Sequence, residues 1–164
     1  MPPYDIAYNI ISFIESENVS DDYYSRYRET KDPNIRMSML SENQDLLDSV
    51  DSSEFEALVF DWFQSRGFKT TRSEESLRYG YDFEIYDKEE NTILIEVKKY
   101  SKNSRVSVGT INQLLGSMSV RGASKGIIVS SSEFTKSAEV YALCSEKKIY
   151  LLTPSKLISG NFHI

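Results

Sequence analysis

The chain has 164 residues, of which 40% are hydrophobic and 27% are charged, and its formal net charge is −6. This length and composition are typical of one soluble globular domain, with or without an appendage. No stretch approaches the roughly 18 apolar residues of a membrane span, and the apolar residues 6–14 are interrupted by polar ones and lack the basic flank of a signal peptide. With one cysteine, Cys144, and one histidine, His163, the sequence excludes an internal disulfide, a Cys/His zinc cluster and a histidine-based triad. A reducing, intracellular location is the simplest setting for a lone cysteine.

The charge is unevenly distributed along the chain. Residues 1–53 contain 11 acidic and 4 basic side chains, a net charge of −7, which leaves +1 for residues 54–164. In that second part six basic residues follow one another with only Glu96 opposing them: Lys98, Lys99, Lys102, Arg105, Arg121 and Lys125. A local basic strip of this kind holds a polyanion whatever the global charge is. Considered alone, the strip fits a solvated polar surface equally well.

Residues 1–53 are predicted to be an acidic, helical N-terminal extension. Ile6, Ile10, Phe13 and Ile14 recur at the spacing of one helix face. A second helix, capped at residues 20–22, carries three tyrosines, and Pro33 ends or interrupts it. No catalytic chemistry is visible here. Packing against the main domain is the preferred interpretation, and contact with a protein partner or with a second copy is the alternative.

The main domain, residues 54–164, is predicted to begin with a helix. Phe55, Leu58, Val59, Trp62 and Phe63 share one face of this helix, and Gly67 stands where the helix should stop. Ser53 as N-cap and Glu56 three residues later match a capping box. Capping is therefore a sufficient structural explanation for Glu56.

Strands and helices alternate through the rest of the domain. The predicted strands are residues 68–72, 81–86, 92–99, 125–131 and 149–152. A polar loop is expected before Gly80. Helices are expected around residues 111–121, from Ser132 or Thr135 onwards, and after Pro154. Of these, the middle helix should turn Ala138, Tyr141, Ala142 and Cys144 inward. The order α-β-β-β-α-β-α-β-α describes an α/β domain with a mixed central sheet.

One predicted strand, Thr92 to Lys99, carries two charges among apolar residues. Glu96 and Lys98 project from the same face, since side chains alternate along a strand. Buried charge is costly unless it is paired or bound to a metal. If Tyr86 pairs with Thr92 across a five-residue loop, Asp82 lies opposite Glu96, whereas a four-residue loop would put Asp82 on the other face. A shared site therefore predicts an odd-length loop or a bulge.

Two acids and a lysine converging on a sheet suit a divalent metal and a phosphate ester. Asp82 and Glu96 are hard oxygen ligands for Mg²⁺, with Mn²⁺ as a substitute, and the Val97 carbonyl is a further ligand. Lys98 can hold the attacking water, stabilise charge on the phosphate, or help to deprotonate the nucleophile. The plain alternative is a salt bridge between Lys98 and one of the acids. Nucleic-acid contacts are predicted for Lys99, Tyr100, Lys102 and Arg105.

At these residues the sequence resembles the PD-(D/E)xK nucleases, and in particular the catalytic domain of Mrr-type (type IV) restriction endonucleases. Gly80-Tyr81-Asp82 and Glu96-Val97-Lys98-Lys99-Tyr100 match the core pattern. The further matches are Phe55-Glu56, Gly67-Phe68, Val108-Gly109, Leu114-Leu115-Gly116, residues 122–131 and residues 134–138. The resemblance covers about residues 54–160. A single glycine, Gly80, precedes Tyr81 where the family often has two, and Glu96 stands where the family often has glutamine, which makes it a stronger metal ligand.

The resemblance implies a restriction-endonuclease-like αβββαβ core and a Mg²⁺-dependent DNA endonuclease. Asp82 and Glu96 would bind the metal and Lys98 would assist hydrolysis. Glu56 matches the first-helix acid of the superfamily, and Gln113 matches a polar position of the next helix, away from its apolar face. It further implies DNA as the partner, an intracellular, cytoplasmic and nucleoid-associated protein, and no membrane contact. Cleavage of two strands by one site per chain suggests a homodimer.

Two other functions remain open. Archaeal Holliday-junction resolvases share the early Glu, the Asp and the Glu-x-Lys arrangement, so a structure-specific junction nuclease is the near alternative. From another class, the domain could be a non-catalytic nucleic-acid-binding module with a vestigial site. Retention of Asp82, Glu96 and Lys98 together disfavours that second alternative. A pure protein–protein adaptor is supported only by the acidic N-terminal segment.

Overall fold

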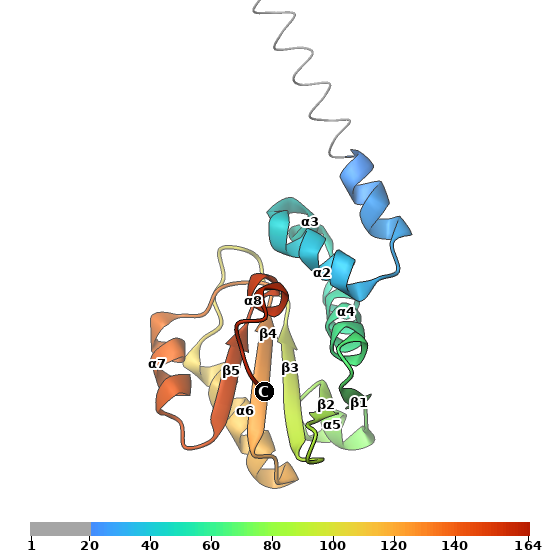
Figure 1. Ribbon diagram of the computed structural model, residues 1–164. Coiled ribbons are helices and arrows are strands. Elements are labelled where there is room, and N and C mark those ends of the chain that lie inside the picture. The colour runs from blue at the N-terminus through green and yellow to red at the C-terminus, as the bar shows by residue number, and fades with distance from the viewer. Residues whose placement is uncertain (1–20) are drawn as a thin grey trace, which may run out of the picture. The chain divides into compact units, whose positions relative to one another are not determined.

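The computed structural model of the chain describes residues 21–164 (Figure 1). The predicted apolar face at residues 6–14 lies outside these residues. The chain divides into two compact units between Asp32 and Pro33. In the described part of the first unit, residues 21–29 form a helix that contains the three tyrosines, as predicted. Pro33 then begins the next helix, where its missing N–H and fixed backbone angle are no disadvantage.

Two short helices open the second unit. Helix α2 spans Pro33–Glu42 and α3 spans Gln44–Ser49, and they bury Met37, Met39, Leu40, Leu46 and Leu47, whereas Ile35 of α2 is exposed. Helix α2 packs against α4 (Ser52–Ser65) and α8 (Pro154–Ser159). Residues 33–53 therefore pack on the main domain, and the predicted boundary at residues 53/54 falls inside one compact unit.

A five-stranded mixed sheet forms the centre of the domain, in the order β1-β2-β3-β4-β5. The strands are β1 Lys69–Thr71, β2 Phe83–Tyr86, β3 Thr92–Lys98, β4 Lys125–Ser130 and β5 Lys148–Leu152. Strands β1, β2 and β3 pair antiparallel, whereas β3, β4 and β5 pair parallel. The predicted α/β class and mixed sheet are confirmed.

Helices cover both faces of the sheet (Figure 1). On one face Phe60 and Phe63 of α4 pack edge-on against Phe83 of β2, at ring distances of 5.1 and 6.2 Å. On the other, α6 (Val108–Arg121) and α7 (Lys136–Cys144) share an apolar cluster with Leu94 and Ile128. Glu96 and Lys98 alternate in phase with Leu94, so they face the α6 side. None of the helices within residues 21–164 is long and apolar enough to span a membrane.

The expected polar loop before Gly80 contains a helix instead. Helix α5 spans Glu74–Tyr79. The Ser73 side chain caps it by accepting a hydrogen bond from the Ser76 N–H, and Gly80 ends it with a left-handed φ of 76°. Caps of this kind are sequence signals for a helix. Six residues are too few to show apolar periodicity, so these caps are the only sequence signal for α5.

Helix α7 begins after Thr135, one of the two predicted starts, but its predicted inner face is wrong in part. Ala138 and Ala142 are buried, whereas Tyr141 and Cys144 are exposed. The two alanines, four residues apart, form the whole buried stripe. The Tyr141 hydroxyl instead donates a hydrogen bond to the Asn112 side chain of α6 at 2.6 Å, which holds the ring at the surface.

A buried carboxylate links β2 to the end of α6. The side chain of Glu84 is only 2% exposed and accepts hydrogen bonds from the hydroxyls of Tyr81 and Tyr86, at 2.5 and 2.7 Å. Arg121 adds two more, at 2.7 and 3.1 Å, and also lies 3.4 Å from Glu75 of α5. Burial costs this carboxylate solvation, but its four donors outweigh that cost and lower the pKa of Glu84.

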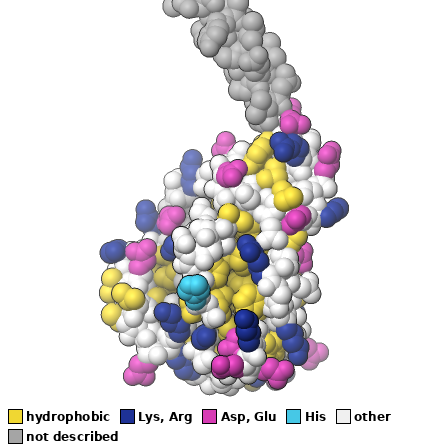
Figure 2. All heavy atoms as spheres, in the orientation of Figure 1, with side chains coloured by type: hydrophobic (Ala, Val, Ile, Leu, Met, Phe, Trp, Pro, Cys, Tyr) yellow, Lys and Arg dark blue, Asp and Glu magenta, His cyan; other side chains and the backbone are white. Residues whose placement is uncertain are grey.

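The predicted basic strip is therefore not continuous. The charge of Arg121 is balanced by Glu84 and Glu75, and Lys125 lies 4.0 Å from Asp87 in the hairpin loop. On the face shown in Figure 2, basic and acidic side chains are interspersed over the surface. Of the six residues, Lys99, Lys102 and Arg105 form no ion pair with any residue from 21 to 164.

We expect Arg121→Ala to reduce the free energy of unfolding by about 3 kcal/mol, because it leaves the Glu84 carboxylate buried without its cation. Equilibrium urea unfolding measures the change. The control is Lys136→Ala, which removes an exposed ion pair to Glu139 at 3.6 Å and should change stability by less than about 0.5 kcal/mol. Equal losses in the two variants would contradict a special role for the Glu84 network.

Candidate active site

The β2–β3 hairpin has the predicted register. Tyr86 pairs with Thr92 and Phe83 with Ile95, so the loop between the strands has five residues, an odd number. The Asp87 side chain closes this loop by accepting hydrogen bonds from the N–H groups of Glu89 and Asn91, both at 2.9 Å. Asp82 lies just before β2, and its own N–H donates to the Ile95 carbonyl at 2.9 Å. The hairpin thus brings Asp82 beside the charged end of β3.

Asp82, Glu96 and Lys98 form a compact cluster there. One oxygen of Asp82 accepts the Val97 N–H at 2.6 Å, and Lys98 Nζ lies 2.6 Å from Glu96 Oε1. The Glu96 side chain is 11% exposed. The salt bridge considered as the plain alternative is therefore present, and it involves Glu96.

Glu56 belongs to the same electrostatic group, and its capping explanation is wrong. The N-cap of α4 is Asp51, whose side chain accepts the Glu54 N–H at 2.8 Å, so Glu56 lies beyond the capping position. Its carboxylate is 3.2 Å from the Arg72 guanidinium instead. Burial and the neighbouring Asp82 carboxylate raise the pKa of Glu56, and Arg72 offsets part of that rise.

The pKa values of the other two carboxyls, Asp82 and Glu96, are also raised. Burial raises the pKa of Asp82 against the opposing effects of the Val97 N–H, Lys98 and Arg72. Burial raises the pKa of Glu96 too, with Asp82 and Glu56 adding to it and Lys98 opposing it. Three acids whose pKa is raised by burial, and in Glu56 and Glu96 also by a neighbouring carboxylate, form a site short of positive charge.

Lys98 is held in its charged form. Burial by itself lowers the pKa of an ammonium group, but the hydrogen bond and charge of Glu96 outweigh that effect and raise the pKa of Lys98. Of the roles considered for Lys98, stabilising negative charge and holding a water fit a protonated lysine, whereas deprotonating the nucleophile does not.

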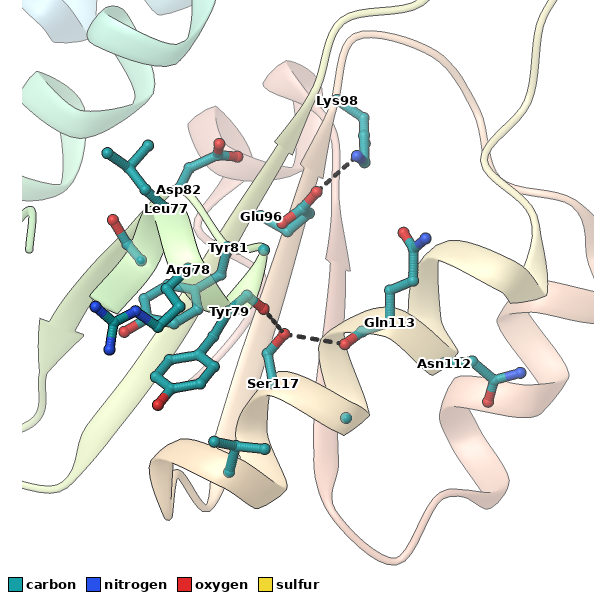
Figure 3. A pocket seen from close by; sticks show the side chains of 14 residues that line it. Leu77, Arg78, Tyr79, Tyr81, Asp82, Glu96, Lys98, Asn112, Gln113 and Ser117 are labelled. Atoms are coloured by element: carbon teal, nitrogen blue, oxygen red, sulfur yellow. Dashed lines mark hydrogen bonds and ion pairs between the residues drawn. The ribbon is translucent and has the colours of Figure 1, made fainter. Parts of the chain in front are cut away.

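A cleft of about 790 Å³ opens over this cluster (Figure 3). Asp82, Glu96 and Lys98 line it from the sheet, Gln113 lines it from the exposed side of α6, and α5 forms another wall. A charged, partly buried cluster inside a large cleft is the expected position of an active site. The α5 wall was missed from the sequence because the loop prediction left no element there.

None of the predicted nucleic-acid contacts lines the cleft. Lys99 and Tyr100 are partly buried, and Tyr100 exchanges two backbone hydrogen bonds of 2.8 Å with the Ser131 hydroxyl. Lys102 and Arg105 are exposed on the connection from β3 to α6, where Arg105 also donates to the Phe134 carbonyl at 3.4 Å. Arg72 was not predicted from the sequence, which contains no local signal for it.

The carboxylates fit a divalent metal by the chemistry of their free oxygens. In residues 21–164, Asp82 Oδ1 and Glu96 Oε2 accept no hydrogen bond, while the second oxygen of each is taken by Val97 or Lys98. Accessible, unpartnered carboxylate oxygens are the donors that Mg²⁺ and Mn²⁺ prefer. Over the same residues, no three acidic, histidine or cysteine side chains already converge on one point. The donor set is thus suited to the ion, with part of its coordination left to water or substrate.

Two solved structures show the same fold. The chain aligns with the MspJI restriction endonuclease in complex with a 27-mer oligonucleotide at a TM-score of 0.50 and 20% identity, covering 74% of this chain and 30% of that one. It aligns with the DNA modification-dependent restriction endonuclease AspBHI at a TM-score of 0.57 and 15% identity, covering 79% of this chain and 35% of that one. This chain therefore spans about a third of each. No curated protein matches the sequence.

A family model for a restriction endonuclease domain, Mrr_cat, matches residues 47–159. The match begins within α3 and extends to the last residue of α8. It includes both strands of the hairpin, the cluster of Asp82, Glu96 and Lys98, and both helical walls of the cleft. The chain belongs to the restriction endonuclease family that the Mrr catalytic domain defines.

Proposed function

We propose that this protein is a Mg²⁺-dependent DNA endonuclease of the PD-(D/E)xK type. One observation carries the proposal: in a restriction endonuclease domain, Asp82 and Glu96 each present a free carboxylate oxygen beside a protonated Lys98 in one cleft. A phosphodiester needs positive charge around its phosphorus and a positioned water, and this cluster is suited to provide both.

Asp82, Glu96 and the Val97 carbonyl would hold the metal. The N–H and C=O of one residue in an extended strand point to the same side, so the Val97 carbonyl would face the side on which its N–H meets Asp82. A bound Mg²⁺ acts as a Lewis acid on a phosphate oxygen and lowers the pKa of a coordinated water. Mn²⁺ has similar ligand preferences and is the expected substitute.

The remaining residues would act on the substrate and the water. Lys98, kept charged by Glu96, would stabilise the negative charge that grows on the phosphate. Gln113 would orient the DNA or the water through its amide, and Glu56 would complete the acidic group behind Asp82. Lys99, Tyr100, Lys102 and Arg105 would contact the DNA backbone beside the cleft, where such contacts position a duplex without reading its sequence.

The test is nicking of a supercoiled plasmid in Mg²⁺ or Mn²⁺, with EDTA as the metal-free arm. Wild type should nick and linearise the plasmid with metal and be inactive in EDTA. The double variant Asp82→Ala/Lys98→Ala, purified identically, should be inactive throughout. Equal cleavage by both proteins would reveal a contaminant, and no cleavage with any metal on any DNA would favour the vestigial DNA-binding module.

Glu56→Gln is expected to lower the cleavage rate about tenfold, which is typical for a residue that supports the metal ligands without binding the metal itself. The matched control is Glu54→Gln, two residues earlier on α4, whose carboxylate pairs with Arg36 at 3.4 Å. Single-turnover rates on the plasmid give the comparison. If both glutamine variants cleave at the wild-type rate, Glu56 has no part in the site.

The class of DNA substrate separates the nuclease alternatives. AspBHI is described as DNA modification-dependent, so the arms are unmodified duplex, methylated duplex and a four-way junction. Preference for a methylated duplex supports a modification-dependent enzyme, and preference for the junction supports a resolvase-like one. Light scattering on the free protein and on its DNA complex tests the proposed homodimer.

A further inference from the structure

We propose that α5 is a DNA-contacting element in which Leu77 inserts between bases and Arg78 contacts the backbone of the strand held in the cleft. The inference rests on the proposed function and adds to it a way of distorting the substrate. The first observation is continuity, since Leu77, Arg78 and Tyr79 line the same cleft as Asp82, Glu96 and Lys98 (Figure 3). Whatever strand reaches the cluster lies against α5.

Leu77 is the most exposed large apolar side chain among residues 21–164, at 88%. Tyr79 beside it is partly exposed, and Val120 of α6, which lines the same cleft, is also exposed. Single leucines on a protein surface are ordinary. Three apolar groups around the entrance of a charged cleft differ from that case, because they offer a surface for the apolar faces of bases.

Helix α5 is anchored, so the exposure of Leu77 does not come from a loose segment. The Ser117 hydroxyl of α6 donates to the Tyr79 carbonyl. The N–H groups of Gly80 and Tyr81 both bond to the Ser76 carbonyl, at 3.1 and 3.2 Å. At the other end, Glu75 lies 3.4 Å from Arg121, whose main partner is the buried Glu84. A side chain on so short and well-held a helix is pre-organised for contact.

The charge and chemistry of this surface favour DNA as its occupant. Arg78 lies in the last turn of α5 and forms no ion pair with any residue from 21 to 164, so its charge is available to a phosphate. Proteins that bend or open DNA insert leucine or similar side chains between base steps, and tyrosine rings stack on exposed bases. Leu77 offers a side chain for insertion, Arg78 a charge for a phosphate and Tyr79 a ring for stacking, all within one turn of helix.

The experiment uses the full chain and duplex oligonucleotides that carry 2-aminopurine at successive positions, in Ca²⁺ for binding and Mg²⁺ for cleavage. The variant is Leu77→Ser, and the matched control is Leu143→Ser on α7, since Leu143 is 85% exposed and lines neither the cleft nor the cluster. Neither change should alter the unfolding temperature, because neither side chain is buried.

Wild type and Leu143→Ser should raise the 2-aminopurine fluorescence at one or two positions, and Leu77→Ser should lose that rise and cleave about tenfold more slowly. Wild-type fluorescence and cleavage by Leu77→Ser overturn the inference and leave the proposed function intact. Equal losses in both serine variants overturn it too. If the fluorescence rise depends on Leu77 but wild type does not cleave, the DNA contact is supported and the nuclease function is rejected. If the protein does not bind DNA, or if α5 binds only protein partners, the inference is rejected.

Discussion

Replacing Asp82 with asparagine is expected to reduce DNA cleavage at least about a hundredfold and, in the absence of metal, to raise the unfolding temperature. Asparagine keeps an oxygen for the Val97 N–H, so the 2.6 Å hydrogen bond can persist. It removes a negative charge whose pKa is raised by burial, which means that ionising Asp82 costs the folded protein stability at neutral pH. It also relieves repulsion with Glu56 and Glu96. Stability and activity should therefore change in opposite directions.

Thermal unfolding in EDTA and in Mg²⁺ measures this prediction alongside plasmid cleavage. Wild type should be stabilised by Mg²⁺, and Asp82→Asn should lose most of that increment, since only the folded site binds the ion. The matched control is Asp87→Asn in the same hairpin. Hydrogen bonds from Asn91 lower the pKa of Asp87, so its charge supports the loop and its replacement should lower the unfolding temperature while leaving the Mg²⁺ increment intact. If both asparagine variants lose stability equally, Asp82 is a structural residue.

The second large effect is expected for Lys98→Ala, which should also lose cleavage by at least about a hundredfold, because it removes the cation placed to stabilise the phosphate. It also leaves the nearly buried Glu96 without its 2.6 Å partner, so it should lower stability in EDTA. Mg²⁺ should restore part of that loss by taking over as the counter-charge of Glu96.

Lys125→Ala serves as the comparison for Lys98→Ala, since Lys125 lies 4.0 Å from Asp87 and does not line the cleft. It should cleave like wild type and respond to Mg²⁺ like wild type. Isothermal titration with Ca²⁺ gives an independent reading of the metal affinity. Loss of both cleavage and all metal binding in Lys98→Ala would show that the lysine only holds the ligands in place.

Strand periodicity and loop length were sufficient to predict the hairpin. The alternation of β2 and β3 and the five residues between them specify which side chains share a face, because a shift by one residue would turn every apolar side chain outward. For the same reason the positions of Asp82, Glu96 and Lys98 could be anticipated together. The helix over 52–65 was also clear, since its apolar stripe repeats over several turns.

Short elements and charge partners could not be predicted in this way. Helix α5 has one turn and a half, too few residues for periodicity, and only its capping residues indicate it. Ser53 and Glu56 match a capping box in sequence, but the N-cap in the structure is Asp51, two residues before Ser53. The sequence assigns Arg121 to a basic strip, whereas in the structure its charge is matched by Glu84, 37 residues away.

By itself, the sequence determined the mixed sheet, the hairpin register and the acidic pair with its lysine, because these depend on alternation and spacing between neighbouring segments. Only the tertiary structure decided which charges are already paired, that the Asp82 carboxylate raises the pKa of Glu56, and that α5 and α6 line a cleft over the cluster. Those outcomes depend on burial and on contacts between residues distant in the chain. The free energy of a charge is set by what surrounds it, and no local pattern records those surroundings.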